Sequence, residues 1–158
     1  MKKVNVYLET TMFNYYFDTE RDGHEATVRF FEAIGAGEYA GYTSDYVLLE
    51  LKNAPEPKQT EMLALLEQYN VHVIDASDEI AGLADIYVRS GIIPLKYRMD
   101  GMHIATAAVH ALDCVLSFNF QHINKLKTKR MTSLVHLNEG YREITICTPM
   151  EVLDNEEA

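Results

Sequence analysis

The chain has 158 residues and a formal net charge of −10, with 47% hydrophobic and 24% charged residues. This length and composition are typical of one globular domain with a sizeable core, and no apolar run approaches the ~20 residues of a membrane span. The negative charge disfavours generic nucleic-acid binding through a basic surface and binding to an anionic membrane. The basic start Met1-Lys2-Lys3 is followed by strand-like sequence without a small-residue cleavage site, so we expect a cytoplasmic protein without a membrane partner.

Short apolar runs rich in β-branched and aromatic residues alternate with longer amphipathic segments along the chain. The runs predict strands over residues 4–8, 39–43, 71–74, 114–118 and 144–147. Helical spacing predicts helices over residues 11–17, 24–36, 44–51, 57–69, 77–91, 99–112, 120–126 and 131–138. This alternation predicts an α/β fold, a three-layer α/β/α sandwich with a mostly parallel sheet of about five strands.

The charged residues and cysteines are unevenly placed in this scheme. Residues 1–150 are expected to form the single domain, and the acidic residues 151–158 a frayed, solvated tail. Half of the 14 lysines and arginines lie in two short segments that flank the fourth strand, at Arg89, Lys96, Arg98, Lys125, Lys127, Lys129 and Arg130. Cys114 and Cys147 lie in strand-like runs, which favours buried thiols in a reducing compartment.

Four polar residues interrupt apolar or element-edge sequence. Glu9 ends the first strand and Glu50 lies on the helix after the second, whereas Asp100 opens the helix over 99–112 and Asn119 follows the fourth strand. In a parallel sheet, the strand ends and the helix starts that follow them share one edge. We therefore expect Glu9, Asp100 and Asn119 to meet there, with Glu50 leaning back toward them from its helix.

Each of these residues also has a purely structural interpretation. Asp100 fits a helix cap, Asn119 fits a turn, and Glu50 fits a surface position. His103 lies one helical turn after Asp100, on the same face. It fits a metal or phosphate ligand, but apolar neighbours favour a histidine of the core or of a hydrogen-bond network.

Gathered carboxylates require either a cation or raised pKa values. Two carboxylates about 4 Å apart repel by ~4 kcal/mol at an effective dielectric constant of about 20. A hard divalent ion such as Mg²⁺ or Mn²⁺ prefers oxygen ligands, activates water and neutralises charge on a phosphodiester. Glu9, Glu50 and Asp100 are therefore the predicted metal ligands. Thr10, Thr11 and Asn14 fit either the positioning of a phosphate or water, or the capping of the short helix after the first strand.

Along nearly its whole length, the chain resembles the PIN-domain family of metal-dependent nucleases. The most specific pieces are Tyr42-Thr43-Ser44 leading to Glu50-Leu51, Asp100-Gly101-Met102-His103-Ile104-Ala105-Thr106-Ala107, Leu116-Ser117-Phe118-Asn119-Phe120 and His122-Ile123. The family's site has an Asp after strand one, a Glu on the helix after strand two, an Asp opening a later helix, and often a fourth acid after strand four. Those positions fall here on Glu9, Glu50, Asp100 and Asn119.

Two of these positions depart from the family pattern. Glu9 is one methylene longer than the usual Asp, and metal sites tolerate misplacement of only ~0.5 Å without rearrangement. Asn119 offers an amide oxygen but no charge where the family often has an acid. A site with three carboxylates is expected to hold one metal more readily than two, with weak, Mn²⁺-favouring or lost activity as the consequences.

The resemblance implies an endoribonuclease in which metal-activated water attacks the RNA phosphate. Glu9, Glu50, Asp100 and Asn119 would be the catalytic residues. The RNA backbone would be held by Thr11, Lys96, Arg98 and Lys125. The resemblance further implies the toxin half of a toxin–antitoxin pair, a homodimer silenced by an antitoxin protein.

Two other classes stay open. The first is a PIN-fold module that binds RNA or protein and has weak or no catalysis, which the residues at positions 9 and 119 motivate. The second is a phosphatase or phosphotransferase of another α/β family. Such enzymes generally need a nucleophilic Asp after the first strand and a second acid two residues on, and Glu9-Thr10-Thr11 lacks both.

Overall fold

The computed structural model describes residues 2–157, with side chains over residues 2–154. Five strands form one sheet in the order β3-β2-β1-β4-β5, and every pair of neighbours is parallel. The strands are β1 (Val4–Leu8), β2 (Tyr39–Ser44), β3 (His72–Ile74), β4 (Cys114–Leu116) and β5 (Thr145–Cys147). The predicted parallel sheet of about five strands is therefore confirmed.

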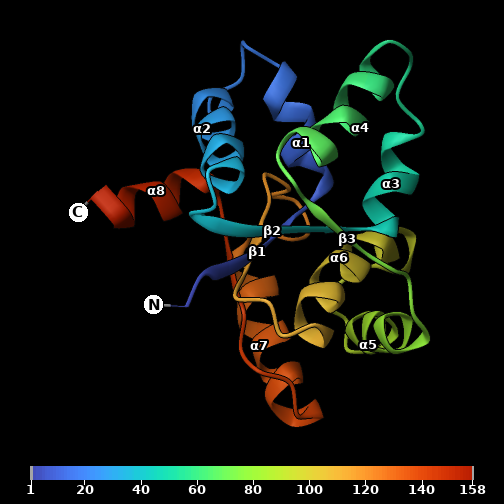
Figure 1. Cartoon of the computed structure of the whole chain (residues 1–158). Coiled ribbons are helices and arrows are strands. Elements are labelled where there is room, and N and C mark those ends of the chain that lie inside the picture. Colours follow the sequence, from blue (N-terminus) through green and yellow to red (C-terminus); the bar gives the residue numbers. More distant parts are fainter. Residues whose placement is uncertain (1, 158) are drawn as a thin grey trace.

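Helices cover both faces of this sheet, as the three-layer prediction requires. They are α1 (Thr10–Phe17), α2 (His24–Gly35), α3 (Asp45–Leu51), α4 (Lys58–Gln68), α5 (Asp78–Arg89), α6 (Arg98–Val109), α7 (Leu126–Glu139) and α8 (Pro149–Glu157), with a 3₁₀ turn at Leu95–Tyr97. Figure 1 shows α1 to α4 on one side of the sheet and α5 to α7 on the other. Among residues 2–157, none of the helices is both long and apolar enough to cross a membrane.

The central strand β1 explains where the site forms. Its residues Val6, Tyr7 and Leu8 are fully buried, as expected for a strand with helices on both faces. Leu8 pairs with Leu116 of β4, while Tyr7 pairs with Tyr42 of β2. The residues that follow β1 therefore lie between the residues that follow β2 and β4.

The segment after β4 differs from the prediction of two short helices over 120–126 and 131–138. One helix, α7, runs through Leu126–Glu139, and residues 120–125 form turns. The buried stripe of α7 is polar and consists of Thr128, Thr132 and His136, whereas Leu134 and Leu137 are 67% and 79% exposed. The prediction was wrong because the leucines of this helix are exposed and its fully buried positions are polar, while Met131 and Val135 are only partly buried against the core.

The C-terminal segment also differs from the predicted frayed tail, because Pro149–Glu157 forms helix α8. Thr148 and Glu151 cap this helix reciprocally, since the Glu151 carboxylate accepts from the Thr148 amide at 3.2 Å and the Thr148 hydroxyl accepts from the Glu151 amide at 3.3 Å. The last predicted tail residue, Ala158, and the side chains after Asp154 lie outside the described residues.

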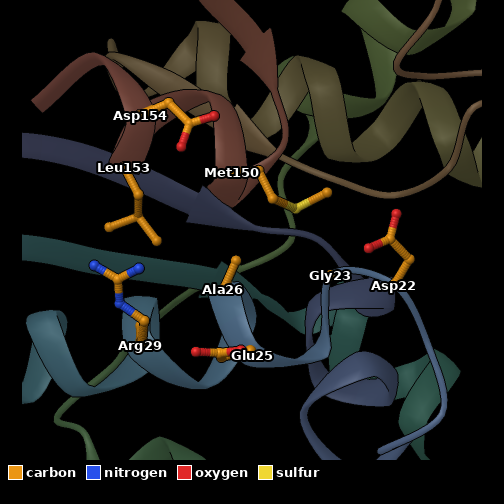
Figure 2. A pocket seen from close by; sticks show the side chains of 8 residues that line it. All are labelled: Asp22, Gly23, Glu25, Ala26, Arg29, Met150, Leu153 and Asp154. Carbon is orange, nitrogen blue, oxygen red and sulfur yellow. The ribbon is translucent and has the colours of Figure 1, made fainter. Parts of the chain in front are cut away.

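Helix α8 packs beside α2 (Figure 1). Figure 2 shows Leu153 of α8 pointing toward Ala26 and Arg29 of α2. A cavity of about 290 Å³ lies between the two helices, and its lining residues include none of the predicted site residues.

Candidate active site

Glu9 joins the end of the central strand to the start of α1. Its side chain caps the helix by accepting a hydrogen bond from the Thr11 amide at 3.2 Å. The hydroxyls of Thr11 and Ser117 donate to the same carboxylate oxygen, Oε1, at 2.5 and 2.7 Å. Ser117 reaches Glu9 because β4 ends beside β1, where Leu8 pairs with Leu116.

Burial dominates the electrostatics of Glu9, which is only 3% exposed. Burial raises the pKa of its carboxyl group, and the charge of His103 and the hydrogen bonds from Thr11 and Ser117 oppose this rise without cancelling it. An ionised carboxylate is therefore incompletely compensated by its protein partners at this position. A bound cation would supply the missing compensation.

Glu50 comes to the same edge from α3, with its side chain leaning back toward β1 as expected. The Ser44 hydroxyl caps α3 by accepting from the Val47 amide at 3.4 Å, which fixes the start of the helix at the end of β2. Glu50 Oε1 then accepts hydrogen bonds from Thr10 Oγ1 at 2.6 Å and from His103 Nε2 at 2.5 Å. These contacts tie α3 to both α1 and α6.

The Glu50 carboxylate differs electrostatically from that of Glu9. Its side chain is 33% exposed, whereas the His103 ring beside it is fully buried. Partial burial tends to raise the pKa of Glu50, but the hydrogen bond and charge of His103 and the hydrogen bond from Thr10 bring the pKa below its ordinary value. In turn, burial tends to lower the pKa of His103, but the hydrogen bond and charge of Glu50 and the charges of Glu9 and Asp100 raise it. The two shifts together favour an ion pair.

His103 is a network residue, as its apolar neighbours in α6 suggested. Its Nδ1 atom lies 2.6 Å from the Tyr7 hydroxyl, and its Nε2 atom bonds Glu50. The Tyr7 hydroxyl is also 2.7 Å from the Ser44 hydroxyl. One chain of hydrogen bonds therefore links β1, the start of α3 and α6 through the interior.

Asp100 lies in the first turn of α6 and is half-buried. The helix is capped at Tyr97 without a side-chain hydrogen bond, so the interpretation of Asp100 as a cap is wrong. Burial raises the pKa of Asp100; the charge of His103 and a hydrogen bond from Asn119 oppose this rise, and the charge of Glu50 adds to it. Asp100 therefore belongs electrostatically to the same cluster.

Asn119 serves two purposes at the end of β4. Its side-chain Oδ1 accepts from the His122 amide at 3.1 Å, so it is a turn residue. Its side chain also hydrogen-bonds Asp100 and thereby favours the ionised form of that carboxyl group. The structural and functional interpretations of Asn119 are therefore compatible.

Among the described residues, one compact group offers ligands suited to a metal ion. Glu9, Glu50 and His103 each present one ligand atom, and these atoms lie within 4.8 Å of one another. This group shares two residues with the predicted ligand set, but it contains His103 in place of Asp100. Its two carboxylates and one imidazole fit Mn²⁺ and, through the oxygen ligands, Mg²⁺.

The residues predicted to contact RNA lie in different surroundings. Thr11 is committed to the protein, because its hydroxyl donates to Glu9 and accepts from the Phe118 amide at 2.8 Å. Arg98 forms an ion pair with Asp85 at 2.6 Å. Lys96 is exposed, with its ammonium 5.7 Å from the centre of the Tyr97 ring, and Lys125 is half-buried at the start of α7.

Sequence reasoning missed three residues that build this site. Ser117 supplies a hydroxyl to Glu9, and Tyr7 and Ser44 anchor His103. A tyrosine inside a fully buried strand usually finds a partner for its hydroxyl group, which was the available signal for Tyr7. No comparable signal marked Ser117, whose partner is more than a hundred residues away in the chain.

Comparisons with known proteins identify the family and the fold of the chain. The family model described as PIN domain matches residues 6–127. No curated protein matches the chain. The chain does resemble solved structures, among them a Mycobacterium tuberculosis VapC20 described as a sarcin–ricin loop cleaving toxin, with 12% identity over 88% of this chain and 98% of that chain and a TM-score of 0.56.

Two further structures share the fold. VapBC2 from Rickettsia felis, bound to a DNA fragment from its promoter, is 17% identical over 77% of this chain and 94% of that chain, with a TM-score of 0.56. A toxin–antitoxin complex from Klebsiella pneumoniae is 16% identical over 77% of this chain and 92% of that chain, with a TM-score of 0.55. At these identities the likeness supports the fold alone. The match to the family model covers most of the chain, and the chain therefore belongs to the PIN domain family.

Proposed function

We propose that the chain is a cytoplasmic, metal-dependent endoribonuclease and the toxin component of a toxin–antitoxin pair. The observation that carries this proposal is that Glu9 and Glu50 present ligand atoms within 4.8 Å of each other and of His103, while Asp100 interacts electrostatically with Glu50 and His103; burial raises the pKa values of Glu9 and Asp100. Burying acidic groups together costs stability, and a cation-dependent activity accounts for that cost.

The site residues would divide the work as follows. Glu9, Glu50 and Asp100 would hold Mg²⁺ or Mn²⁺, and Asn119 would fix the orientation of Asp100 through the hydrogen bond between them. A bound divalent ion would supply an activated water and neutralise charge that develops on the phosphodiester. Ser117 and Thr11 hold the Glu9 carboxylate in place, which limits the freedom of the longer side chain.

The RNA backbone would approach over the cationic residues near this edge. Lys96 is exposed and lies shortly before Asp100 in the chain, and Lys125 is the N-cap of α7, shortly after Asn119. Arg98 would reach RNA only by releasing Asp85, because its guanidinium is already paired. Thr11 would act indirectly through Glu9. We therefore assign the main phosphate contacts to Lys96 and Lys125.

The partners follow from the structural relatives. Two of them were solved as or within toxin–antitoxin assemblies, which supports an antitoxin protein as the regulator of this chain. We extend the proposal to a homodimer, as expected from the family resemblance. Light scattering measures the mass of the chain alone, which tests the homodimer, and its mass when co-expressed with the product of an adjacent gene, which tests the antitoxin partner.

Cleavage of RNA by the purified chain, freed of any partner, tests the enzymatic proposal. We expect cleavage that requires Mg²⁺ or Mn²⁺, stops with a chelator, and is lost in Asp100→Asn. The matched control is Glu67→Gln, which neutralises an exposed carboxylate on α4. Absence of cleavage by the wild-type protein with either metal, or full activity in Asp100→Asn, would reject this function.

A second candidate function is a PIN-fold module that binds RNA or protein with weak or no catalysis. The specific observation in its favour is that Glu9 is turned into the protein and accepts three hydrogen bonds on Oε1. Asn119 also brings no charge to the fourth position. Calorimetric Mn²⁺ binding accompanied by RNA turnover would count against this candidate.

A further inference from the structure

Both ring nitrogens of His103 are engaged with protein atoms. Nε2 donates to Glu50 Oε1 at 2.5 Å, because a carboxylate only accepts, and Nδ1 lies 2.6 Å from the Tyr7 hydroxyl. The ring is fully buried, and Tyr7 is itself fully buried. His103 therefore cannot offer a nitrogen to a metal without giving up one of these two contacts.

The contacts of Glu50 are one-sided. Thr10 and His103 both donate to Oε1, and neither bond uses Oε2. Two donors on one oxygen fix the carboxylate plane, since Thr10 approaches from α1 and His103 from α6. The partly exposed side chain would otherwise have solvent-facing rotamers available to it.

The anchoring extends into the core. Ser44, Tyr7, His103, Glu50 and Thr10 form a continuous series of hydrogen bonds, and the distances between successive partners are 2.5–2.7 Å. Ser44 and Tyr7 lie on the paired strands β2 and β1, so the series begins within the buried part of the sheet. Hydrogen bonds of this kind behind a ligand orient the ligand and raise its affinity for metal.

We propose that His103 is a positioning residue for Glu50, which it holds so that Oε2 can face the metal, and that it is not itself a metal ligand. The proposal rests on the metal-dependent function proposed above. It explains why the compact group contains a histidine, whose ligand atom lies within 4.8 Å of ligand atoms of both carboxylates. In this arrangement, His103 belongs to the group because it contacts Glu50, and Asp100 supplies the further oxygen ligand.

The test combines pulsed electron paramagnetic resonance with Mn²⁺ titration of the full, tag-free chain in a buffer without nitrogen ligands. For wild-type protein we expect Mn²⁺ binding without the ¹⁴N coupling of a directly bound imidazole. A strong ¹⁴N coupling that disappears in His103→Gln would overturn the proposal, because it would make His103 a ligand. This measurement on the wild type does not depend on the folding of any variant.

Two substitutions separate the roles of the two ring nitrogens. Gln places an N–H donor near the position of Nε2, so His103→Gln should retain Mn²⁺ affinity close to that of the wild type. Asn places its amide near Nδ1, so His103→Asn should bind Mn²⁺ about 10–100-fold more weakly, as typical for loss of a group behind a ligand. Equal affinity in both variants and the wild type would overturn the positioning role.

Failure of the proposed function has a different signature. If the wild-type chain binds no Mn²⁺, the metal-dependent function and the positioning role fall together. If it binds Mn²⁺ with strong nitrogen coupling, the function stands and only the positioning role falls. Thermal unfolding of each variant checks the fold. Thr10→Val removes the other donor to Glu50 Oε1 at a position less buried than His103, and it should also weaken Mn²⁺ binding.

Discussion

Two regions each contribute a glutamate to the site: the β1–β4 corner, where Glu9 meets Ser117, and the α3–α6 face, where Glu50 meets His103. The pKa values of the two carboxyl groups shift in opposite directions. Glu9 accepts three hydrogen bonds from neutral donors, yet its pKa is raised. Glu50 accepts two hydrogen bonds, one of them from His103, and its pKa is lowered. The neutral donors and the charge of His103 together do not offset burial at Glu9, whereas the direct hydrogen bond and charge of His103 more than offset the partial burial of Glu50.

The opposite pKa shifts mean that the negative charge is compensated to different degrees in the two regions. The α3–α6 face is close to neutral within the protein, because His103 and Glu50 compensate each other. The β1–β4 corner holds a carboxylate that feels the charge of His103 but whose hydrogen-bond donors are all neutral. A metal bound between them would relieve Glu9 most, which is why we regard Glu9 as the residue that couples metal binding to stability.

The largest expected effect of substituting either glutamate is on the rate of RNA cleavage, and it should be similar in both regions. Glu9→Gln and Glu50→Gln should each reduce metal-dependent RNA cleavage by about 10²–10³-fold, because each removes one charged group from a preorganised site. Initial rates of cleavage of a labelled RNA measure the effect. Glu67→Gln is the matched control and should cleave like the wild type. Wild-type rates in either site variant would break the assignment of that residue.

Stability without metal should separate the two glutamates. Glu50→Gln should lower the free energy of unfolding by about 1–2 kcal/mol near pH 6, below the full value of a charge-assisted bond because a third of the side chain is exposed. Urea denaturation in the presence of a chelator measures this loss. An unchanged midpoint would show that the His103–Glu50 pair contributes nothing to folding.

The pH dependence of that loss follows from the two shifts. A lowered carboxyl pKa stabilises the fold above the unfolded value of about 4.3, and this part is lost as pH falls through the folded pKa of Glu50. A raised imidazole pKa stabilises the fold below the unfolded value of about 6.5, and this part is lost as pH rises through the folded pKa of His103. The cost of Glu50→Gln should therefore be greatest between about pH 4.5 and 6.5.

Removing one donor from Glu9 should have a smaller effect. Ser117→Ala deletes the hydroxyl that donates to Glu9 and accepts from the Asn119 amide, and it should cost about 1 kcal/mol at pH 7 in metal-free protein. Ser133→Ala, which loses only an exposed contact with Glu143, is the control. A cost equal to that of the control would mean that Ser117 does not stabilise the Glu9 carboxylate.

The smallest expected effect has the opposite sign. Glu9→Gln should raise the unfolding midpoint of the metal-free protein at pH 7 slightly, because the amide keeps an acceptor for the three donors and removes a buried charge. A raised carboxyl pKa destabilises the fold above the folded pKa, and the penalty disappears as pH falls through it. The gain should therefore shrink on acidification, and a loss of stability at pH 7 would contradict the comparison.

The layers and the sheet could be predicted because the buried parts of β1 and β4, Val6–Leu8 and Cys114–Leu116, are apolar runs between amphipathic helices. Helix α7 could not, because Thr128, Thr132 and His136 face the interior while leucines face solvent. Helix α8 was foreseeable, since Thr148 and Glu151 have the spacing of a capping box. The difference at α7 arises because polar side chains occupy buried positions where the hydrophobic pattern predicts apolar ones.

The site was predictable to the level of the sheet edge and no further. The pairing of β1 with β4 brings Glu9 to Ser117, beside Asn119, and Asp100 in the first turn of α6 interacts with Asn119. The contact between His103 and Glu50 depends on how α6 packs against α3, and no spacing in the sequence encodes that distance. The ligand set of Glu9, Glu50 and Asp100 stays a prediction.

The central claim is that these acidic residues form a metal centre, and a crystal soaked in Mn²⁺ tests it most directly. We predict an anomalous-scattering peak bounded by carboxylate oxygens of Glu9, Glu50 and Asp100, with the His103 ring still bonded to Glu50 and Tyr7. Absence of a peak at this edge with saturating Mn²⁺, while Glu9 keeps its contacts with Thr11 and Ser117, would contradict the account.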